Sequence, residues 1–114
     1  MDWGKVTYIF LSLMSLTTTA GFIYEPNTIA LFIAASVNLI STIIKIGVKN
    51  LLAAELLASS LVADLHLIPA FLVVVFSGDI QLAIALAIGA VIANIVSIAL
   101  SLIESAKSSE KEDY

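Results

Sequence analysis

The stretch SLVADLHLIPAFLVVVF, from Ser60 to Phe76, decides the fold, because it sets an acid, an imidazole and a proline in an otherwise hydrocarbon run. These residues are Asp64, His66 and Pro69. The run belongs to an apolar segment longer than the roughly 20 residues that cross a bilayer core. An ionisable residue at the centre of such a segment costs about 2.5–3.5 kcal/mol, which favours a functional role for Asp64.

The rest of the chain has the same apolar character. Of its 114 residues, 61% are hydrophobic and 12% are charged, and the mean hydropathy is +1.10. A soluble domain of this length has no means of burying so much apolar surface, so the composition predicts an all-α integral membrane protein. With no cysteine and one histidine, we expect neither a metal site nor a cofactor. The net charge of -4 comes largely from the tail and says little about nucleic acid, but the lack of a basic patch argues against binding to it.

Four apolar segments are long enough to span a membrane, at about residues 6–24, 28–46, 51–76 and 80–103. The links between them are short and contain residues that cap or end helices, namely Asn27, Gly47, Asn50 and Asp79. Short links predict an antiparallel four-helix bundle over residues 1–106, with a polar tail at 107–114. The sequence from Glu104 onward, ESAKSSEKEDY, is expected to be solvated, as frayed helix or disorder.

The basic residues predict the orientation. All five are lysines, and all lie on the side of the two termini and the second link: Lys5, Lys45, Lys49, Lys107 and Lys111. The positive-inside rule therefore places both termini in the cytoplasm, in the cell (inner) membrane. Aromatic residues near the span ends are expected to form interfacial belts, with Trp3 and Tyr8 on one side and Phe22, Tyr24 and Phe76 on the other.

Strongly polar residues on three spans share one depth. Counting about 1.5 Å per residue from the links places Asp64, His66, Asn38 and Asn94 near the midplane. The third span has polar groups on two sides, so we expect it to be the most buried helix. Within one subunit, Asp64 is expected to face Asn94 and His66 to face Asn38, or one of the two faces a neighbouring subunit.

A second polar layer lies nearer the cytoplasm. Lys45 and Glu55 flank the second link, where we expect either that they meet as an ion pair or that Lys45 extends to the headgroups and Glu55 bonds to water. The functional alternative is that Glu55 forms an acidic vestibule. Polar stripes at helical spacing run through the second span, at Asn38, Ser41, Thr42, Lys45 and Lys49, and through the fourth, at Asn94, Ser97 and Ser101.

Pro69 is predicted to kink or break the third span. Proline lacks an N–H and clashes with the carbonyl of Leu65, which frees backbone oxygens there. Such oxygens beside the Asp64 carboxylate are hard ligands for cations. Alternatively Pro69 makes a tolerated kink, with hydroxyls or water bonding to the freed carbonyls.

No catalytic motif is present, so we expect no enzymatic activity. The lead hypothesis is a homo-oligomeric cation channel or pore in the lipid bilayer. Asp64 supplies its charge, carbonyls at Leu65 supply ligands, His66 senses pH and Glu55 lines the inner mouth, with Asn38 and Asn94 in the same polar layer. Two alternatives stay open: a small proton-coupled transporter, and a non-conducting accessory subunit of a larger complex.

Overall fold

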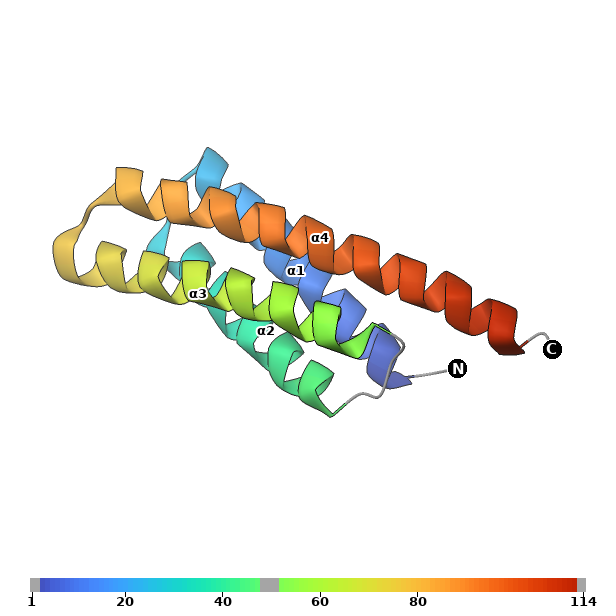
Figure 1. The fold of residues 1–114 in the computed structure, drawn as a ribbon. Coiled ribbons are helices and arrows are strands. Elements are labelled where there is room, and N and C mark those ends of the chain that lie inside the picture. The colour runs from blue at the N-terminus through green and yellow to red at the C-terminus, as the bar shows by residue number, and fades with distance from the viewer. Residues whose placement is uncertain (1–2, 48–51, 113–114) are drawn as a thin grey trace.

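The computed structural model describes residues 3–47 and 52–112, with side chains described as far as Lys107. The described chain forms α1 (Trp3–Tyr24), α2 (Thr28–Ile46), α3 (Ala53–Ser77) and α4 (Ile80–Glu112). All four helices are long and apolar enough to cross a membrane, which confirms the predicted all-α chain of four such helices. They lie side by side in an elongated bundle of 55 × 23 × 19 Å, with both termini at one end (Figure 1).

The helices form a ring in which each packs against two others. The packed pairs are α1–α2, α2–α3, α3–α4 and α1–α4, and the described residues show no packing between diagonal helices. The link between α1 and α2 and the link between α3 and α4 lie at the end of the bundle opposite the termini (Figure 1). This end is called the link end below, and the other the terminal end.

Local side-chain chemistry sets the helix boundaries. Asn27 precedes α2, and its Oδ1 accepts a hydrogen bond from the Ile29 N–H at 2.8 Å. Asp79 does the same before α4, with the Leu82 N–H at 3.1 Å. Side-chain caps of this kind satisfy the orphan N–H groups of a first turn. Gly47 follows α2 as predicted, whereas the predicted cap Asn50, like Lys49, lies outside the described residues.

Gly78 ends α3 in the left-handed conformation, with φ of 68°. Its N–H bonds back to the carbonyls of Val73 and Val74. A residue with a Cβ is strained at this φ, so glycine is favoured at this position. α3 itself runs through Pro69 as one helix, so the predicted break is absent, and the kink stays a prediction.

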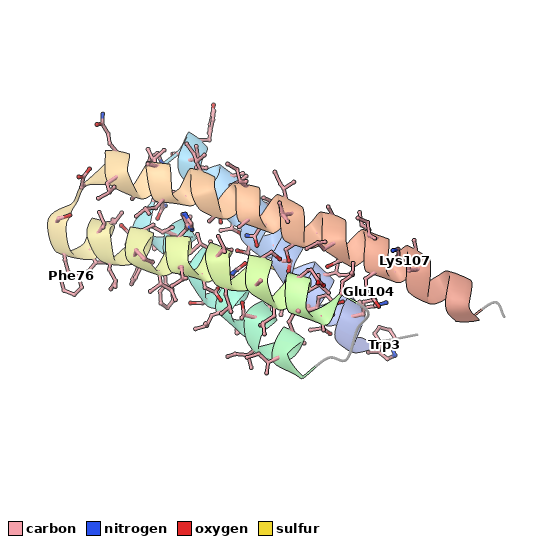
Figure 2. The ribbon with its side chains drawn as sticks, in the orientation of Figure 1. Trp3, Phe76, Glu104 and Lys107 are labelled. Atoms are coloured by element: carbon pink, nitrogen blue, oxygen red, sulfur yellow. The ribbon has the colours of Figure 1, made fainter. Side chains whose placement is uncertain are left out.

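α4 continues well past its predicted span, to Glu112. Glu104 is only 3% exposed, and its Oε2 lies 2.7 Å from Lys5 Nζ on α1. The expectation that the chain is solvated from Glu104 onward was therefore wrong at its first residue. Lys5 compensates the carboxylate there, because α1 and α4 stay in contact up to the terminal end. Lys107, one turn further on, is exposed (Figure 2).

The belt prediction held for only some of the aromatic residues. Trp3, Tyr24 and Phe76 are exposed, and Trp3 and Phe76 lie at opposite ends of the bundle (Figure 2). Tyr8 and Phe22 are fully buried, so their assignment to the belts was wrong. The reason is the inward face of α1, where buried residues recur at intervals of three and four: Tyr8, Ser12, Ser15, Thr19 and Phe22.

The interior of the bundle is divided in two. The half nearest the link end is an apolar core of small and aliphatic side chains: Phe22, Leu31, Ala34, Ala35, Leu67, Ala70, Ala83, Ala87 and Ala90. The half toward the terminal end holds most of the buried polar side chains, from Asn38 to Lys45 on α2 and from Asn94 to Glu104 on α4. A polar interior thus begins at one end and stops about halfway along the bundle.

Candidate functional site

Lys45 lies at the centre of the polar half. It is the penultimate residue of α2 and is only 4% exposed. Its Nζ donates hydrogen bonds to three serine hydroxyls, on α1, α3 and α4: Ser12 at 3.1 Å, Ser60 at 3.2 Å and Ser97 at 2.8 Å. An ammonium group has three donors, so the other three helices together satisfy all of them.

An aromatic ring on α1 also contacts the Lys45 ammonium group, and bonds between α1 and α2 position one of its serine partners. The Lys45 Nζ lies 5.6 Å from the centre of the Tyr8 ring, a cation–π contact. The hydroxyls of Ser12 and Ser41 are 3.0 Å apart, and Ser41 donates to the Tyr8 carbonyl at 3.1 Å. These bonds join α1 to α2 between Tyr8 and Ser12 and so hold Ser12 in place beside Lys45.

The Asp64 carboxylate is 5% exposed and is held by α2. Asn38 Nδ2 donates to its Oδ1 at 2.6 Å, and Thr42 Oγ1 lies 2.6 Å from its Oδ2. The two α2 residues are one helical turn apart, which matches the span of a carboxylate. Burying an ionised group is costly unless it is paired and hydrogen-bonded, and this arrangement provides bonds to both oxygens.

Two hydroxyls connect Lys45 to Asp64. The Thr42 hydroxyl has one hydrogen, and an ionised carboxylate only accepts, so Thr42 donates to Asp64. Ser60 Oγ is 2.9 Å from Thr42 Oγ1 and 3.2 Å from Lys45 Nζ. The Thr42 hydroxyl is also placed to donate to Ser60 and, at 3.0 Å, to the Asn38 carbonyl. With the Thr42 hydrogen on Asp64, Ser60 accepts from Lys45 and donates to Thr42, and an unbroken hydrogen-bond chain runs from Lys45 through Ser60 and Thr42 to Asp64.

Asn94 brings α4 to the same level. It is fully buried, and its Nδ2 lies 3.4 Å from Ser15 Oγ, which donates to the Ala34 carbonyl at 3.1 Å. Ala34 is one turn before Asn38 on α2. The predicted common depth of Asn38, Asp64 and Asn94 therefore agrees with the contacts.

The predicted facing of the third span was the wrong way round. Asp64 faces Asn38 on α2, and His66 faces α4, where its ring lies against the backbone of Gly89. Its Nδ1 is 2.7 Å from the Val62 carbonyl, so that nitrogen is the donor. The two side chains are about 200° apart around the axis of an ideal helix. The rotation of α3 that directs Asp64 toward α2 therefore directs His66 toward α4.

Two further expectations about the site need correction. Glu55 is exposed while Lys45 is buried among serines, so they do not form the predicted ion pair. The serine hydroxyls keep the ammonium inside the bundle. α2, rather than α3, has the most buried membrane-spanning window, 39% against 33%. Its entire described polar stripe, including Ser41, faces inward.

Leu65 and Pro69 lie away from the polar network. The Leu65 side chain is 70% exposed, on the outer surface of the bundle, and Pro69 is half-buried. In the sequence, the serines that bind Lys45 were not recognised as its partners. Ser12 belongs to the inward stripe of α1, and the interval of three and four along that stripe was the signal that would have identified it.

The fold and the site together define a small multi-pass membrane protein with a charged hydrogen-bond network inside its bundle. The chain belongs to DUF6394, a family of unknown function whose model matches residues 25–105. The matched range contains Asn38, Lys45, Asp64 and Asn94, whereas Ser12 on α1 precedes it. Neither the curated proteins nor the solved structures include a match to this chain.

Proposed function

We propose that this protein is a small proton-coupled membrane transporter in which Lys45 and Asp64 form the proton-binding pair. The observation that supports this most strongly is the chain from the buried Lys45 ammonium through Ser60 and Thr42 to the Asp64 carboxylate. With the Thr42 hydrogen on Asp64, each link is a donor facing an acceptor. A shift of one proton along each link then converts the Lys45 ammonium and the Asp64 carboxylate into a neutral amine and a neutral acid, with all atoms and charges conserved.

A line of polar groups leads from the terminal end to this pair. Ser97, Ser101 and Glu104 follow one another at intervals of four and three on α4, all buried. Ser101 donates to the Ser97 carbonyl at 2.9 Å, and Glu104 meets Lys5 at the terminal end. Protons therefore have a polar route to Lys45 from that end. The apolar core separates the pair from the link end.

The placement of the charges favours a transporter over the oligomeric cation channel. The Asp64 carboxylate on α3 bonds to α2 of the same chain, and Lys45 on α2 is its countercharge. Asp64 therefore does not face the outer surface, where another subunit would pack. A cation passing Asp64 inside the bundle would also pass the Lys45 ammonium. The channel and the accessory subunit remain the alternatives, and a homo-oligomer remains a prediction.

The membrane and the orientation belong to the same proposal. We place the protein in the cytoplasmic membrane with both termini in the cytoplasm, because the lysines gather at the terminal end and Glu25 and Asp79 at the link end. The polar route to Lys45 then opens toward the cytoplasm.

Proton movement in liposomes tests this function. The purified protein is reconstituted with a pH-sensitive dye inside, and gradients of alkali cations, an organic cation and an organic anion are imposed one at a time. We expect at least one solute gradient to drive proton movement that Lys45→Met and Asp64→Asn abolish. Lys107→Met, which removes an exposed lysine, is the matched control. Proton movement no greater than in protein-free liposomes for every solute would reject the transporter and favour the accessory subunit.

A further inference from the structure

Two buried amide oxygens have no hydrogen-bond partner among the described residues: Asn38 Oδ1 and Asn94 Oδ1. Both side chains are fully buried. A buried polar atom without a partner loses the hydrogen bonds that it makes in water, so it requires a physical explanation. The two side chains are buried at the same level on diagonal helices, so the interior there holds two unused acceptors; the third such atom among the described residues, Glu104 Oε2, lies beside Lys5 at the terminal end.

The partners of the two amide nitrogens fix which way the oxygens point. Asn38 Nδ2 lies against Asp64 Oδ1 at 2.6 Å and the Ser60 carbonyl at 3.4 Å, and both of these groups only accept. Asn94 Nδ2 lies against Ser15 Oγ, whose own hydrogen is donated to the Ala34 carbonyl. Exchanging oxygen and nitrogen in Asn38 would set acceptor against acceptor, and exchanging them in Asn94 would take the Ser15 hydrogen away from the Ala34 carbonyl. The orientations that keep these bonds leave the two oxygens without partners.

The surrounding atoms are oxygen ligands with a single negative charge. The Asp64 carboxylate is held by Asn38 itself, and the Ser15 hydroxyl contacts Asn94. Carboxylate, amide and hydroxyl oxygens are the ligands of hard cations, and neither nitrogen nor sulfur ligands are needed. One carboxylate matches one positive charge, which favours a monovalent cation over a divalent one.

We propose that Asn38 Oδ1, Asn94 Oδ1 and the Asp64 carboxylate form an internal binding site for a small alkali cation. The inference rests on the proposed function and names the class of solute that would be exchanged against protons. Such a cation and the Lys45 ammonium compete for the one negative charge of Asp64. The groups in contact with the Lys45 ammonium are neutral, namely the Tyr8 ring and the hydroxyls of Ser12, Ser60 and Ser97. Since none of these replaces the charge of Asp64, cation binding should strengthen as pH rises and Lys45 loses its proton.

Thermal unfolding of the purified protein in detergent tests the site without any transport. The unfolding temperature is measured in NaCl, KCl and LiCl against choline chloride, at equal ionic strength and at two pH values. We expect one of the alkali cations to raise it by at least about 4 °C at saturating concentration. The rise should need less cation at the higher pH.

Two variants assign the effect to the site. Asn94→Leu removes the unpartnered oxygen at similar volume, so it should fold in choline chloride as well as the wild type and lose the cation response at least tenfold in affinity. Gln81→Leu removes an exposed amide from the same helix and should keep the response. No cation-specific rise in the wild type, or an equal rise in Asn94→Leu, would overturn the site.

The two proposals fail separately. Proton movement driven by a solute other than an alkali cation, together with no alkali-specific stabilisation, would leave the transporter and remove this site. Alkali-specific stabilisation that Asn94→Leu abolishes, in a protein that moves no protons, would leave the site and remove the transporter.

Discussion

Lys45 Nζ and Ser97 Oγ lie 2.8 Å apart, although α2 and α4 stand at diagonal corners of the bundle and do not pack against each other. The contact therefore crosses the interior, and it places the lysine charge between the helices rather than at the lipid surface. A lysine this close to a helix end usually extends toward the headgroups. Here hydroxyls from three helices hold it inside the bundle.

This placement predicts strong coupling between Lys45 and Asp64. Either Lys45→Met or Asp64→Leu leaves the opposite charge buried alone, and each should lower the free energy of unfolding by about 3–5 kcal/mol. The double variant buries no charge, so its loss should be well below the sum of the two. Unfolding in mixed detergent micelles, followed by circular dichroism, measures the cycle. Additive losses would show that the two charges do not interact.

The close approach of α3 to α4 predicts an intolerance to side chains at Gly89. A Cβ at this position would lie 2.7 Å from His66 Nε2 and 3.3 Å from its Cγ. Gly89→Ala should therefore cost about 1–3 kcal/mol, because the ring has to move or the helices have to separate. The same unfolding measurement checks it, and adding His66→Ala should recover most of the loss.

Gly21 provides the matched control for this prediction. It lies inside α1 with no atom near enough to contact an added Cβ. Gly21→Ala should stabilise the protein by about 0.5–1 kcal/mol, because alanine loses less backbone entropy in a helix than glycine. A loss of stability in both variants would mean that the helix backbone, rather than the His66 contact, is responsible.

The ion pair between Lys5 and Glu104 predicts that α4 depends on α1 at the terminal end. Lys5→Met leaves a carboxylate that is only 3% exposed without this countercharge, and should cost about 1.5–3 kcal/mol. Glu104→Gln in the same background removes the uncompensated charge and should restore part of the stability. The stabilities of the single and the double variant are compared by measuring their unfolding temperatures in detergent. If Lys5→Met leaves the unfolding temperature unchanged, the ion pair contributes nothing to stability.

The number of helices and most of their limits, apart from the C-terminal end of α4, could be predicted from the sequence because both depend on local properties. Hydrophobic length defines the spans, and Asn27 and Asp79 cap helices through atoms only two and three residues away. The common depth of Asn38, Asp64 and Asn94 followed from the same counting. These inferences need no knowledge of how the helices are rotated in the bundle.

The partners within the site could not be predicted, because they depend on that rotation. Asp64 and His66 each had two possible neighbours, and the sequence gives no rule for choosing between α2 and α4. Lys45 was expected to meet Glu55 because opposite charges that flank the link between adjacent antiparallel helices are the simplest pairing. The structure instead uses three neutral serines from three helices, an arrangement that depends on the packing of the whole bundle.

The last prediction concerns the orientation, which the absence of cysteine makes simple to measure. Asp79→Cys places a single thiol at the link end, and Lys107→Cys places one at the terminal end, both at exposed positions. In intact bacterial cells expressing each variant, a membrane-impermeant maleimide should label Asp79→Cys directly and Lys107→Cys only after the membrane is opened. The physical reason for this expectation is the positive-inside rule, applied to the lysines at the terminal end. The reverse pattern would invert the topology and would direct the polar route to Lys45 to the outside. Labelling of both thiols in intact cells would show that the bundle does not keep one orientation.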